Sequence, residues 1–333
     1  MFASTVRGPV LVTGGAGYIG SHVCKALAEA GAQPLCLDTL EKGHEWAVRW
    51  GDLARGDVGD GRFIEEVFQR YKPQVVIHLA GYIEVGESVA NPERYLVNNS
   101  AKSRVLIGAA IRHKIEAFVF SSTCAVYGIP RADLLQEEHK IAPLNPYGVS
   151  KASVERALEA ATWRGLRSAS LRYFNAAGAD SGGEIGEAHE PETHLLPLAV
   201  DAALGLRGTL VVHGEDYPTP DGSCVRDFVH VSDLADAHLK AVEWLMRQKP
   251  GRGRHDVFNL GSGAGYSVKQ VVQEIGRAVG RPVPHVFGAR RPGDSPQLVG
   301  CIAKAQRDLG WTPLRGLETQ IEDTVRWRRA MVR

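Results

Sequence analysis

The segment "TGGAGYIGSH" (Thr13 to His22) restricts the fold of this chain more strongly than any other part of its 333 residues. It follows a short apolar run typical of a buried strand and leads into "IGSHVCKALAEAG", where apolar residues recur at helical spacing. Within it, Gly14, Gly17 and Gly20 lie three residues apart. In a strand–turn–helix unit, such glycines permit the tight turn, the approach of a diphosphate to the backbone, and close packing of the helix on the sheet. The segment therefore predicts dinucleotide binding at a helix N-terminus.

The first half of the chain alternates strand patterns with helix patterns. Strands are predicted over residues 9–14, 33–38, 74–81, 117–123 and 168–175, and helices over 63–71, over roughly 92–113 and after Pro146. This alternation predicts a parallel sheet covered by helices on both faces, which is a doubly wound (Rossmann-type) α/β fold. Such folds bind ligands at the carboxyl ends of their strands.

The alternation breaks after Asn175. A loop rich in glycine and acidic residues follows, then a helix pattern from Ser232 to Met246, and then "DVFNLGSG", a strand that we expect to return to the main sheet. We expect a dinucleotide-binding domain over residues 1–174, with a returning segment near 225–262. Residues 175–224 and 263–333 are expected to form a smaller, mixed α/β lobe that binds the substrate.

Charge and cysteine content exclude several classes of function. The formal net charge is +1, so no strong field favours nucleic acid or an anionic membrane. No apolar run approaches the length of a membrane span, and the first residues lack the apolar core of a secretory signal. The five cysteines are odd in number and include no C-x-x-C pair. We therefore expect a cytoplasmic protein with reduced thiols, no metal site, and no nucleic-acid or membrane partner.

Two aspartates are candidates for holding the adenosine half of a dinucleotide. Asp38 ends the strand after the glycine turn, about twenty residues further on, where a carboxylate can accept hydrogen bonds from both ribose hydroxyls. It would also repel a 2′-phosphate, so the sequence favours NAD over NADP; the alternative is an ordinary turn residue at a strand end. Asp57 either reaches the adenine amino group or caps the N-terminus of the next helix, and the spacing leaves both open.

The segment "NPYGVSK" contains a candidate for proton transfer. Tyr147 and Lys151 are four residues apart, so they share one face of the helix that Pro146 opens. Free tyrosine, with a pKa near 10, is a poor base at neutral pH. The positive charges of a lysine and of an oxidised nicotinamide ring both favour the phenolate, and a hydroxyl of the preceding "SST" can hold an alcohol. A structural helix pair is the alternative, but the glycine turn upstream favours catalysis.

Four segments, "GGAGYIGSH", "SSTCAVYG", "NPYGVSK" and "LRYFNAAGA", resemble the extended short-chain dehydrogenase/reductase family. The stretches "YPTPDGSCVRDFVHVSDLADAH", "NLGSG" and "RRPGD" narrow the resemblance to the UDP-glucose 4-epimerases, over nearly the whole chain. The resemblance implies an isomerase for the reversible epimerisation at C4 of a UDP-hexose (UDP-galactose to UDP-glucose). It also implies a transient 4-keto sugar, tightly bound NAD and a homodimer.

The resemblance assigns roles to individual residues. Tyr147 is implied as the base, Lys151 as the residue that orients the ribose and lowers the tyrosine pKa, and Thr123 as the partner of the 4-hydroxyl. The implied cofactor site consists of Gly14, Gly17, Tyr18, Ile19, Gly20, Asp38, Thr39, Asp57, Val58, Leu79, Ala80, Gly81, Ile83, Asn98, Thr123, Tyr147, Lys151, Tyr173 and Phe174. The implied UDP-sugar site consists of Thr123, Tyr147, Asn175, His194, Leu195, Val211, Val212, His213, Arg226, Arg291, Asp294 and Leu298.

Several of these positions depart from the pattern of well-known bacterial members. Ile83 stands where many have lysine, His194 where asparagine is frequent, and His213 where phenylalanine is common. Leu298 occupies the gate position beside the C2 substituent of the sugar, where an aromatic side chain is associated with plain hexoses and a small one with N-acetylated sugars. Leucine is intermediate, so the sequence leaves the preferred sugar open.

Three alternatives accompany this interpretation. A 4-epimerase of a UDP-N-acetylhexosamine, UDP-pentose or UDP-uronate would share these motifs. A sugar-nucleotide dehydratase would carry an Asp-Glu pair where this chain has Cys124 and Ala125, and a non-catalytic nucleotide-binding module would have a broken Thr/Tyr/Lys set.

Two helices are candidates for the dimer interface. The helices around Ser100–Arg112 and Val154–Trp163 have apolar faces that either pair across a two-fold axis or are covered inside the monomer.

Overall fold

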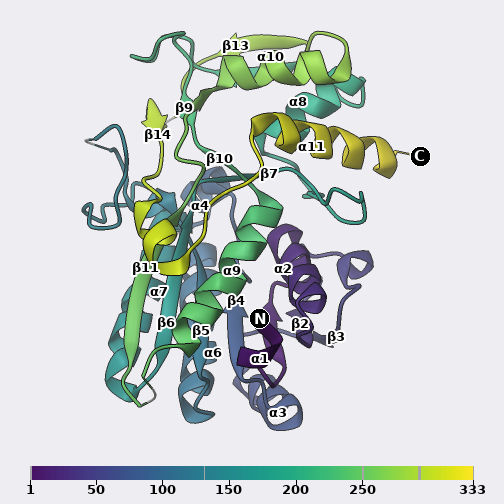
Figure 1. Ribbon diagram of the computed structural model, residues 1–333. Helices are drawn as coiled ribbons and strands as arrows, with labels where there is room; N and C mark the ends of the chain where they lie inside the picture. Colours follow the sequence, from purple (N-terminus) through teal and green to yellow (C-terminus); the bar gives the residue numbers. More distant parts are fainter. Residues whose placement is uncertain (1, 131, 250, 292–293, 333) are drawn as a thin grey trace.

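The computed structural model describes residues 2–130, 132–249, 251–291 and 294–332. Figure 1 shows one large sheet with helices on both of its faces, and a smaller group of helices and short strands at one end of that sheet. The predicted doubly wound α/β fold is confirmed. No helix among the described residues combines the length and the hydrophobicity that crossing a membrane requires.

The main sheet has seven parallel strands in the order β11-β6-β5-β4-β1-β2-β3. Their bounds are β1 Val10–Thr13, β2 Pro34–Asp38, β3 Asp52–Arg55, β4 Val75–His78, β5 Ala117–Thr123, β6 Arg167–Tyr173 and β11 Arg254–Leu260. The late strand β11 pairs with β6, so the predicted return of the chain to the main sheet is observed. The strand order reverses beside β1, and the glycine turn lies at that point.

Alternate residues of the strands pack on opposite faces of the sheet. Val10 and Val12 join the core under α2 (Tyr18–Glu29), α9 (Val231–Met246) and the short α1 (Phe2–Thr5). Leu11 joins the core under α3 (Gly61–Tyr71), α6 (Lys102–Arg112) and α7 (Pro146–Ala161). Burial on both faces explains why these strands are continuously apolar rather than alternating.

The segment from residue 85 to 112 corrects one prediction. The expected single helix over roughly 92–113 is divided into α5 (Pro92–Tyr95), a π-helical segment η2 (Leu96–Ala101) and α6, preceded by α4 (Val85–Ala90). Asn99, which is buried in η2, exchanges hydrogen bonds with the backbone of Tyr82 at 2.8 and 2.9 Å. A π-turn accommodates one extra residue and is frequent at functional sites. Here it accompanies an inward-facing amide that periodicity alone does not reveal.

The lobe at the end of the sheet has a core of its own. It is formed by α8 (Leu195–Leu204), α10 (Val268–Val279) and α11 (Leu317–Met331), with the parallel pair β8 (Leu210–His213) and β13 (His285–Gly288). Two small sheets lie between this core and the main sheet. They pair β7 (Asn175–Ala177) with β10 (Phe228–His230), and β9 (Val225–Arg226) with β12 (Tyr266–Ser267) and β14 (Gln297–Leu298). The remaining short segments are η1 (Glu45–Ala47), η3 (Cys124–Val126), η4 (Thr162–Arg164) and η5 (Ala305–Leu309).

The apolar faces that we considered for a dimer are covered inside the monomer. Leu106 of α6 and Leu158 of α7 belong to the buried core under the sheet. Exposed apolar side chains gather instead near the starts of these helices, on α4, η2 and the first turn of α7. They are Val85, Val89, Leu96, Val97 and Val149.

Candidate active site

The three glycines of the turn meet different steric conditions. Gly14 has φ +71°, and a methyl group there would lie 2.7 Å from the amide nitrogen of Ala80. A methyl group at Gly20 would lie 2.0 Å from the carbonyl oxygen of Gly14, so α2 packs directly on the turn. At Gly17 the same carbonyl oxygen is the one near atom, at 3.3 Å. Gly17 is also the N-cap of α2 and offers no capping side chain, so its surroundings leave room for a ligand.

Asp38 lies at the end of β2, directly beside this turn. Its carboxylate accepts hydrogen bonds from the backbone amides of Ala16, at 3.1 Å, and Leu40, at 2.9 Å. Burial raises the pKa of Asp38, and these amides oppose that rise. The neighbouring Thr39 is exposed. The backbone of the turn therefore fixes the position of the carboxylate, and its role as a ribose acceptor stays a prediction.

The surroundings of Asp57 exclude one of its two predicted roles. Its carboxylate accepts hydrogen bonds from the amide of Gly59, at 2.7 Å, and from Lys102 Nζ, at 2.6 Å. The N-cap of α3 is Asp60, whose side chain accepts from two amides of the first turn. The N-cap alternative for Asp57 is therefore wrong, because the helix begins later. The next residue, Val58, is buried in the core under the sheet.

The residues that follow β4 run past the glycine turn. Leu79 donates its amide to Thr13 O at 3.0 Å, and Ala80 is the residue that a side chain at Gly14 would strike. A methyl group at Gly81 would lie 3.1 Å from Asn99 Oδ1 and 3.5 Å from Lys151 Nζ. Leu79, Ala80 and Gly81 thus connect the turn to the helix that carries the proton-transfer candidates.

The π-helical segment contributes a residue that sequence reasoning missed. Asn98, the predicted residue, donates to Asn99 Oδ1 at 3.2 Å. Asn99 in turn binds the backbone of Tyr82 and donates to Ser150 Oγ at 3.2 Å, so it ties the strand-end loop to α7. Consecutive asparagines within an apolar helix pattern were the available signal. Ile83, the neighbour of Tyr82, is partly buried in the same loop.

Tyr147 and Lys151 lie in the first turns of α7, as predicted. Asn145 caps this helix by accepting from the amide of Gly148 at 2.8 Å, and Pro146 is its first residue. Lys151 is 2% exposed, and its Nζ donates to the carbonyl oxygen of Ser121 at 2.9 Å. The same Nζ lies 5.9 Å from the centre of the Tyr147 ring. The helix thus brings both side chains to the end of β5.

Burial dominates the electrostatics of this pair. It raises the pKa of Tyr147 to about 12, and the nearby Thr123 side chain offsets part of that rise. It also lowers the pKa of Lys151 to about 8. Tyr147 and Thr123 thus lie close to each other, as the predicted constellation requires. The predicted lowering of the tyrosine pKa by Lys151 remains a prediction for the cofactor-bound enzyme.

The predicted diphosphate contacts form one cluster. Arg226 Nη2 lies 3.6 Å from Asp294 Oδ1, and Arg291 Nε donates to Asp294 Oδ2 at 3.0 Å. Arg226 also donates to the carbonyl oxygens of Val225 and Ser295 at 2.9 and 2.8 Å. Arg226 of β9 therefore meets Arg291 and Asp294, which lie about seventy residues further along the chain, and Asp294 stands between the two guanidinium groups.

Leu298 connects this cluster with the proton-transfer group. It pairs with Arg226 across β14 and β9, and it packs against the buried cluster that contains Cys124 and Phe174. Asn175 donates its side-chain amide to the carbonyl oxygen of Asp227, which lies between β9 and β10, at 2.8 Å. The gate position therefore lies next to η3, which begins directly after Thr123.

The side chains of two predicted site residues, Tyr173 and Val212, point into cores of the protein. The Tyr173 hydroxyl is hydrogen bonded to His238 Nε2 inside the core, so it does not face a ligand. Val212 is buried in the core of the lobe, whereas Val211 and His213 on the same strand are exposed. His213 Nδ1 donates to the carbonyl oxygen of Ala289 at 3.2 Å. Tyr173 and Val212 can therefore contact a ligand through their backbone atoms but not through their side chains.

His194 is surrounded by carboxylates. It is the N-cap of α8, directly before Leu195, and its Nδ1 lies 2.7 Å from Glu187 Oε1 and 3.2 Å from Glu192 Oε1. Although burial acts in the opposite direction, these carboxylates raise the pKa of His194 to about 10. The pKa of Glu187 falls to about 2 through the same contacts.

The model of the NAD dependent epimerase/dehydratase family matches residues 10–261. The chain belongs to this family.

Individual members are similar over almost the full length. A UDP-glucose 4-epimerase from Rhizobium meliloti (strain 1021) is 49% identical over 319 residues, which cover 96% of each chain. The crystal structure of UDP-glucose 4-epimerase from Brucella ovis in complex with NAD has a TM-score of 0.92 and 45% identity, and covers 96% of this chain and 98% of that one. The enzyme from Stenotrophomonas maltophila with bound NAD and formylated UDP-arabinopyranose has a TM-score of 0.93 and 35% identity, covering 98% and 99%.

The residues of this NAD dependent family member fit the dinucleotide. Gly17 leaves the N-terminus of α2 open, and a hollow beside it is lined by Tyr18, Lys42 and His44 among others. Ile19 and Gly20 form the first turn of the same helix. A cofactor diphosphate at this N-terminus would meet free backbone amides and the positive end of the helix dipole.

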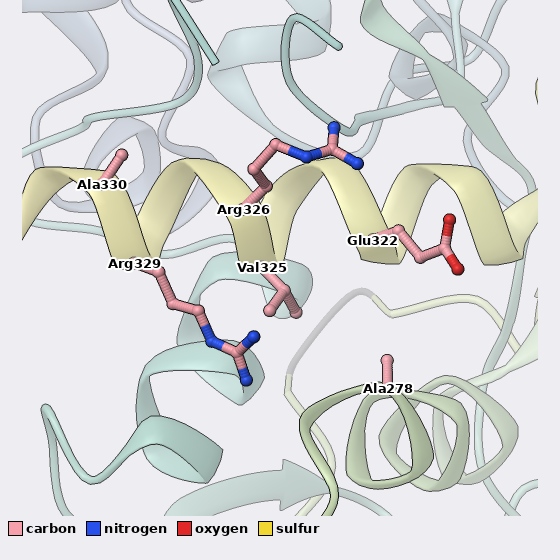
Figure 2. A pocket seen from close by; sticks show the side chains of 6 residues that line it. All are labelled: Ala278, Glu322, Val325, Arg326, Arg329 and Ala330. Atoms are coloured by element: carbon pink, nitrogen blue, oxygen red, sulfur yellow. The ribbon is translucent and has the colours of Figure 1, made fainter. Parts of the chain in front are cut away.

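A larger hollow lies away from this site. It has a volume of about 510 Å³ and is an open depression between α10 and α11. Figure 2 shows Arg329 and Glu322 extending from α11 on the side that faces α10, and Arg326 on the other side. The lining residues are Ala278, Glu322, Val325, Arg326, Arg329 and Ala330, and none of them is a predicted site residue.

Proposed function

We propose that this chain catalyses the reversible C4 epimerisation of a UDP-hexose, interconverting UDP-galactose and UDP-glucose with tightly bound NAD. The observation that carries the proposal is that Tyr147 and Lys151, one turn apart on α7, lie at the end of β5 close to Thr123, beside the segment that passes the glycine turn. The similarity to proteins named UDP-glucose 4-epimerase over almost the full chain supports the same reaction.

In the proposed reaction, bound NAD supplies the hydride acceptor and donor at C4 of the sugar. Thr123 holds the 4-hydroxyl, and Tyr147 takes its proton and later returns it to the same oxygen, after the hydride has been delivered to the opposite face of C4. Because burial raises the pKa of Tyr147, the phenolate needs positive charge nearby, and Lys151 is the group that supplies it from the protein. A single tyrosine then serves as base and acid within one cycle.

We propose that the two regions of the chain divide the binding task. Residues 1–174, with the returning segment near 225–262, would hold NAD through the glycine turn, Asp38, and the residues that follow β4. Residues 175–224 and 263–333 would hold the UDP-sugar. Asp57, Val58, Asn98, Phe174 and Ile83 complete the proposed cofactor site, and Asn175, Leu195 and His213 the proposed sugar-nucleotide site.

Arg226 and Arg291 are the proposed diphosphate contacts. A guanidinium group can donate two parallel hydrogen bonds to phosphate oxygens, which fixes the nucleotide firmly. UDP would therefore stay anchored while the 4-keto sugar rotates about its link to the diphosphate.

The structure favours epimerisation over dehydration, the other reaction class in the family name. Dehydration requires an acid and a base after the strand-end Thr123. Burial raises the pKa of the Cys124 thiol to about 12, and Ala125 has no ionisable group. Neither residue can therefore transfer a proton at neutral pH.

The identity of the sugar is a separate question. A relative named UDP-glucose-4-epimerase has been solved with formylated UDP-arabinopyranose, so members of this kind accommodate a pentose. Leu298 packs against the buried cluster that contains Cys124 and Phe174, and its intermediate size leaves the C2 substituent open. An equilibrium assay with UDP-galactose, UDP-N-acetylgalactosamine, UDP-galacturonate and UDP-arabinose in parallel tests the proposal. Interconversion of UDP-galactose and UDP-glucose is expected; turnover of only another pair would overturn the first choice.

We also propose a homodimer in the cytoplasm. The exposed apolar side chains on α4, η2 and the first turn of α7, including Leu96, Val97 and Val149, offer a face for a second copy. The molecular mass in solution tests the dimer, and Leu96→Glu should shift the equilibrium toward the monomer.

The cysteines support the proposed compartment. All five are unpaired among the described residues, which suits a reducing compartment.

A further inference from the structure

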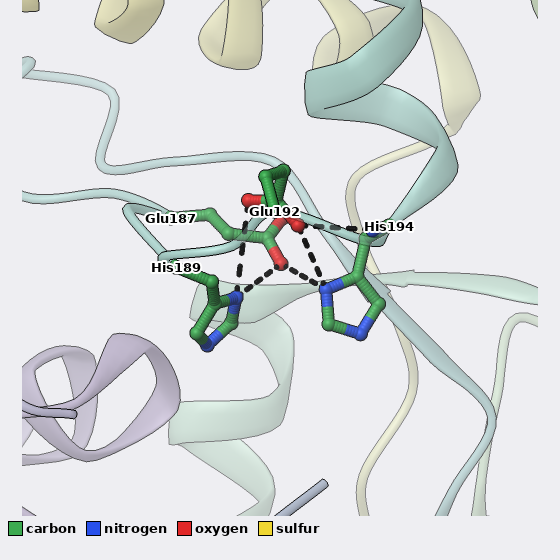
Figure 3. Close-up of side chains that lie close together, drawn as sticks. All are labelled: Glu187, His189, Glu192 and His194. Carbon is green, nitrogen blue, oxygen red and sulfur yellow. Dashed lines mark hydrogen bonds and ion pairs between the residues drawn. The ribbon is translucent and has the colours of Figure 1, made fainter. Parts of the chain in front are cut away.

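Four side chains of the loop between β7 and α8 converge on one point. They are Glu187, His189, Glu192 and His194, and Figure 3 shows both imidazole rings turned toward the two carboxylates. Each residue offers one ligand atom, and these atoms all lie within 4.8 Å of one another. Their sequence pattern is E-x-H-x-x-E-x-H and contains no cysteine. The prediction of no metal site rested on cysteine spacing, which gives no sign of this cluster.

The distances within the cluster suit a small cation. Nδ1 of His194 lies 2.7 and 3.2 Å from the nearest oxygens of Glu187 and Glu192. Nδ1 of His189 lies 3.1 and 3.9 Å from oxygens of the same two carboxylates. Zinc–ligand bonds of about 2.0–2.2 Å place two ligand atoms of a tetrahedral site roughly 3.3 Å apart. The observed separations bracket that value.

Glu192 gives an independent indication of a cation. Its side chain is 9% exposed, and its Oε2 atom is buried with no hydrogen-bond partner among the described residues. His189 Nδ1 is 3.9 Å from this oxygen, which is beyond hydrogen-bonding distance. An unpartnered buried carboxylate oxygen is costly, and a bound cation would satisfy it.

The loop backbone is held in place by neighbouring elements. Trp327 of α11 donates its indole N–H to the carbonyl oxygen of Glu187 at 2.9 Å. His44 donates Nε2–H to the carbonyl oxygen of Ala188 at 2.7 Å. The ligand residues are therefore pre-positioned, and His194, with 43% of its side chain exposed, leaves an entry path for an ion.

We propose that Glu187, His189, Glu192 and His194 form a binding site for one divalent transition cation of the Zn²⁺ class, with both histidines ligating through Nδ1. Imidazole and carboxylate ligands together suit Zn²⁺ and its neighbours Co²⁺ and Ni²⁺ rather than Mg²⁺ or Ca²⁺. The two carboxylates neutralise the charge of the ion. Because His189 stands edge-on against Tyr18 of the glycine turn, the ion would fix this loop over the start of α2. Nε2 of His194 remains free for the sugar-nucleotide role proposed above.

The test uses the full chain with its NAD, stripped of metal by a chelator and titrated with Zn²⁺ by calorimetry. We expect one ion per chain, and Co²⁺ in its place should give the visible absorption of a four-coordinate site. Glu192→Gln and His189→Gln should each weaken binding at least ten-fold, because each removes one ligand. The control is His285→Gln, an exposed histidine of β13 whose Nδ1 donates to the backbone.

The stability of the protein gives a second readout. Zn²⁺ should raise the thermal unfolding midpoint of the wild type and of His285→Gln, but not of Glu192→Gln. Midpoints measured without metal identify a variant that is merely misfolded. Absence of stoichiometric binding to the wild type would overturn the proposal. So would binding that both ligand variants retain, or that the His285 variant loses, because the ion would then be adventitious.

Discussion

The cofactor side and the sugar-nucleotide side of the candidate site are built by different means. On the cofactor side, the shape comes from the backbone: Gly14 and Gly20 leave no space for a side chain, and backbone amides hold Asp38. On the sugar-nucleotide side, long side chains from separate loops meet. Arg291, whose side chain is 60% exposed, is held by Asp294 through a single ion pair at 3.0 Å.

This difference agrees with what each ligand requires. A cofactor that is regenerated in every cycle can occupy a rigid, pre-formed site. A substrate must enter and leave, and exposed ion pairs contribute only about 0–1 kcal/mol to stability. The exposed Arg291 can therefore exchange Asp294 for a diphosphate at small cost. The predictions below test this contrast, in order of decreasing effect.

The largest effect is expected at the glycine turn. Gly20→Ala places a methyl group against the Gly14 carbonyl and should lower the free energy of unfolding by about 3 kcal/mol or more, as overpacking does. Gly17→Ala should change it by no more than about 1 kcal/mol and still weaken NAD binding at least ten-fold. Denaturant unfolding and the NAD content of the purified protein measure the two quantities.

The matched control for Gly17 is Gly316, the N-cap of α11, which also lacks a capping side chain and has no atom within 4 Å of an added methyl group. Gly316→Ala should leave NAD content unchanged. Equal loss of NAD in both variants would show that the effect is one of helix capping, and not of the diphosphate site.

The second effect concerns the buried lysine. Lys151→Met should reduce turnover by about 10²–10⁴-fold, the range typical of proton-transfer groups. Its stability should differ from that of the wild type in a pH-dependent way. The pKa of Lys151 is lowered to about 8 in the folded protein, so above pH 8 the unfolded chain binds more protons than the folded one. Wild-type stability relative to the variant should then rise with pH, by at most about 1.4 kcal/mol per unit, until the ordinary lysine pKa is reached.

Denaturant unfolding of the NAD-free proteins between pH 7 and pH 10 checks this expectation (a range spanning roughly the two pKa values). A flat difference between wild type and Lys151→Met across this range would mean that the lysine is not held in the desolvated position described here.

The third effect separates the two sides directly. Arg291→Leu should raise the KM for the UDP-sugar at least ten-fold, because a bidentate phosphate contact is lost, and should leave NAD content unchanged. The adjacent Arg290 is the control, since it pairs with Asp216 at 2.6 Å and is outside the proposed site. Arg290→Leu should not change KM. Similar KM values for the two variants would contradict the assignment of Arg291.

The smallest effect is expected at the gate. Leu298→Tyr should favour plain hexoses over N-acetylated ones in kcat/KM, and Leu298→Ser should favour the reverse, each by about ten-fold, the range for a methylene-scale change of pocket size. Parallel assays with UDP-galactose and UDP-N-acetylgalactosamine measure the ratio. An unchanged ratio in both variants would remove Leu298 from the list of specificity residues.

The same contrast explains how much could be predicted from the sequence. The sheet, its covering helices and the glycine turn were predictable, because periodicity and glycine spacing are local properties. The return of β11 to the sheet was also predictable from its apolar pattern. By comparison, the cluster of Arg226, Arg291 and Asp294 depends on loops that meet only in space, and only the family resemblance brought these residues together.

Other features could not be predicted for identifiable reasons. The π-helical segment around Asn99 replaces the expected continuous helix, because a buried amide binds the backbone of Tyr82 from a distant part of the sequence. The hydroxyl of Tyr173 turns to His238 in the core, a choice between two faces that strand alternation does not settle. Each depends on a tertiary contact that overrides the local pattern.

The measurement that tests the central claim most directly is the epimerisation rate of Tyr147→Phe, with its NAD content determined on the same preparation. If Tyr147 carries the proton between Thr123-bound alcohol and ketone, kcat should fall by about 10²–10⁴-fold while NAD content and the thermal midpoint stay close to those of the wild type. Turnover within a few-fold of the wild type would contradict the account.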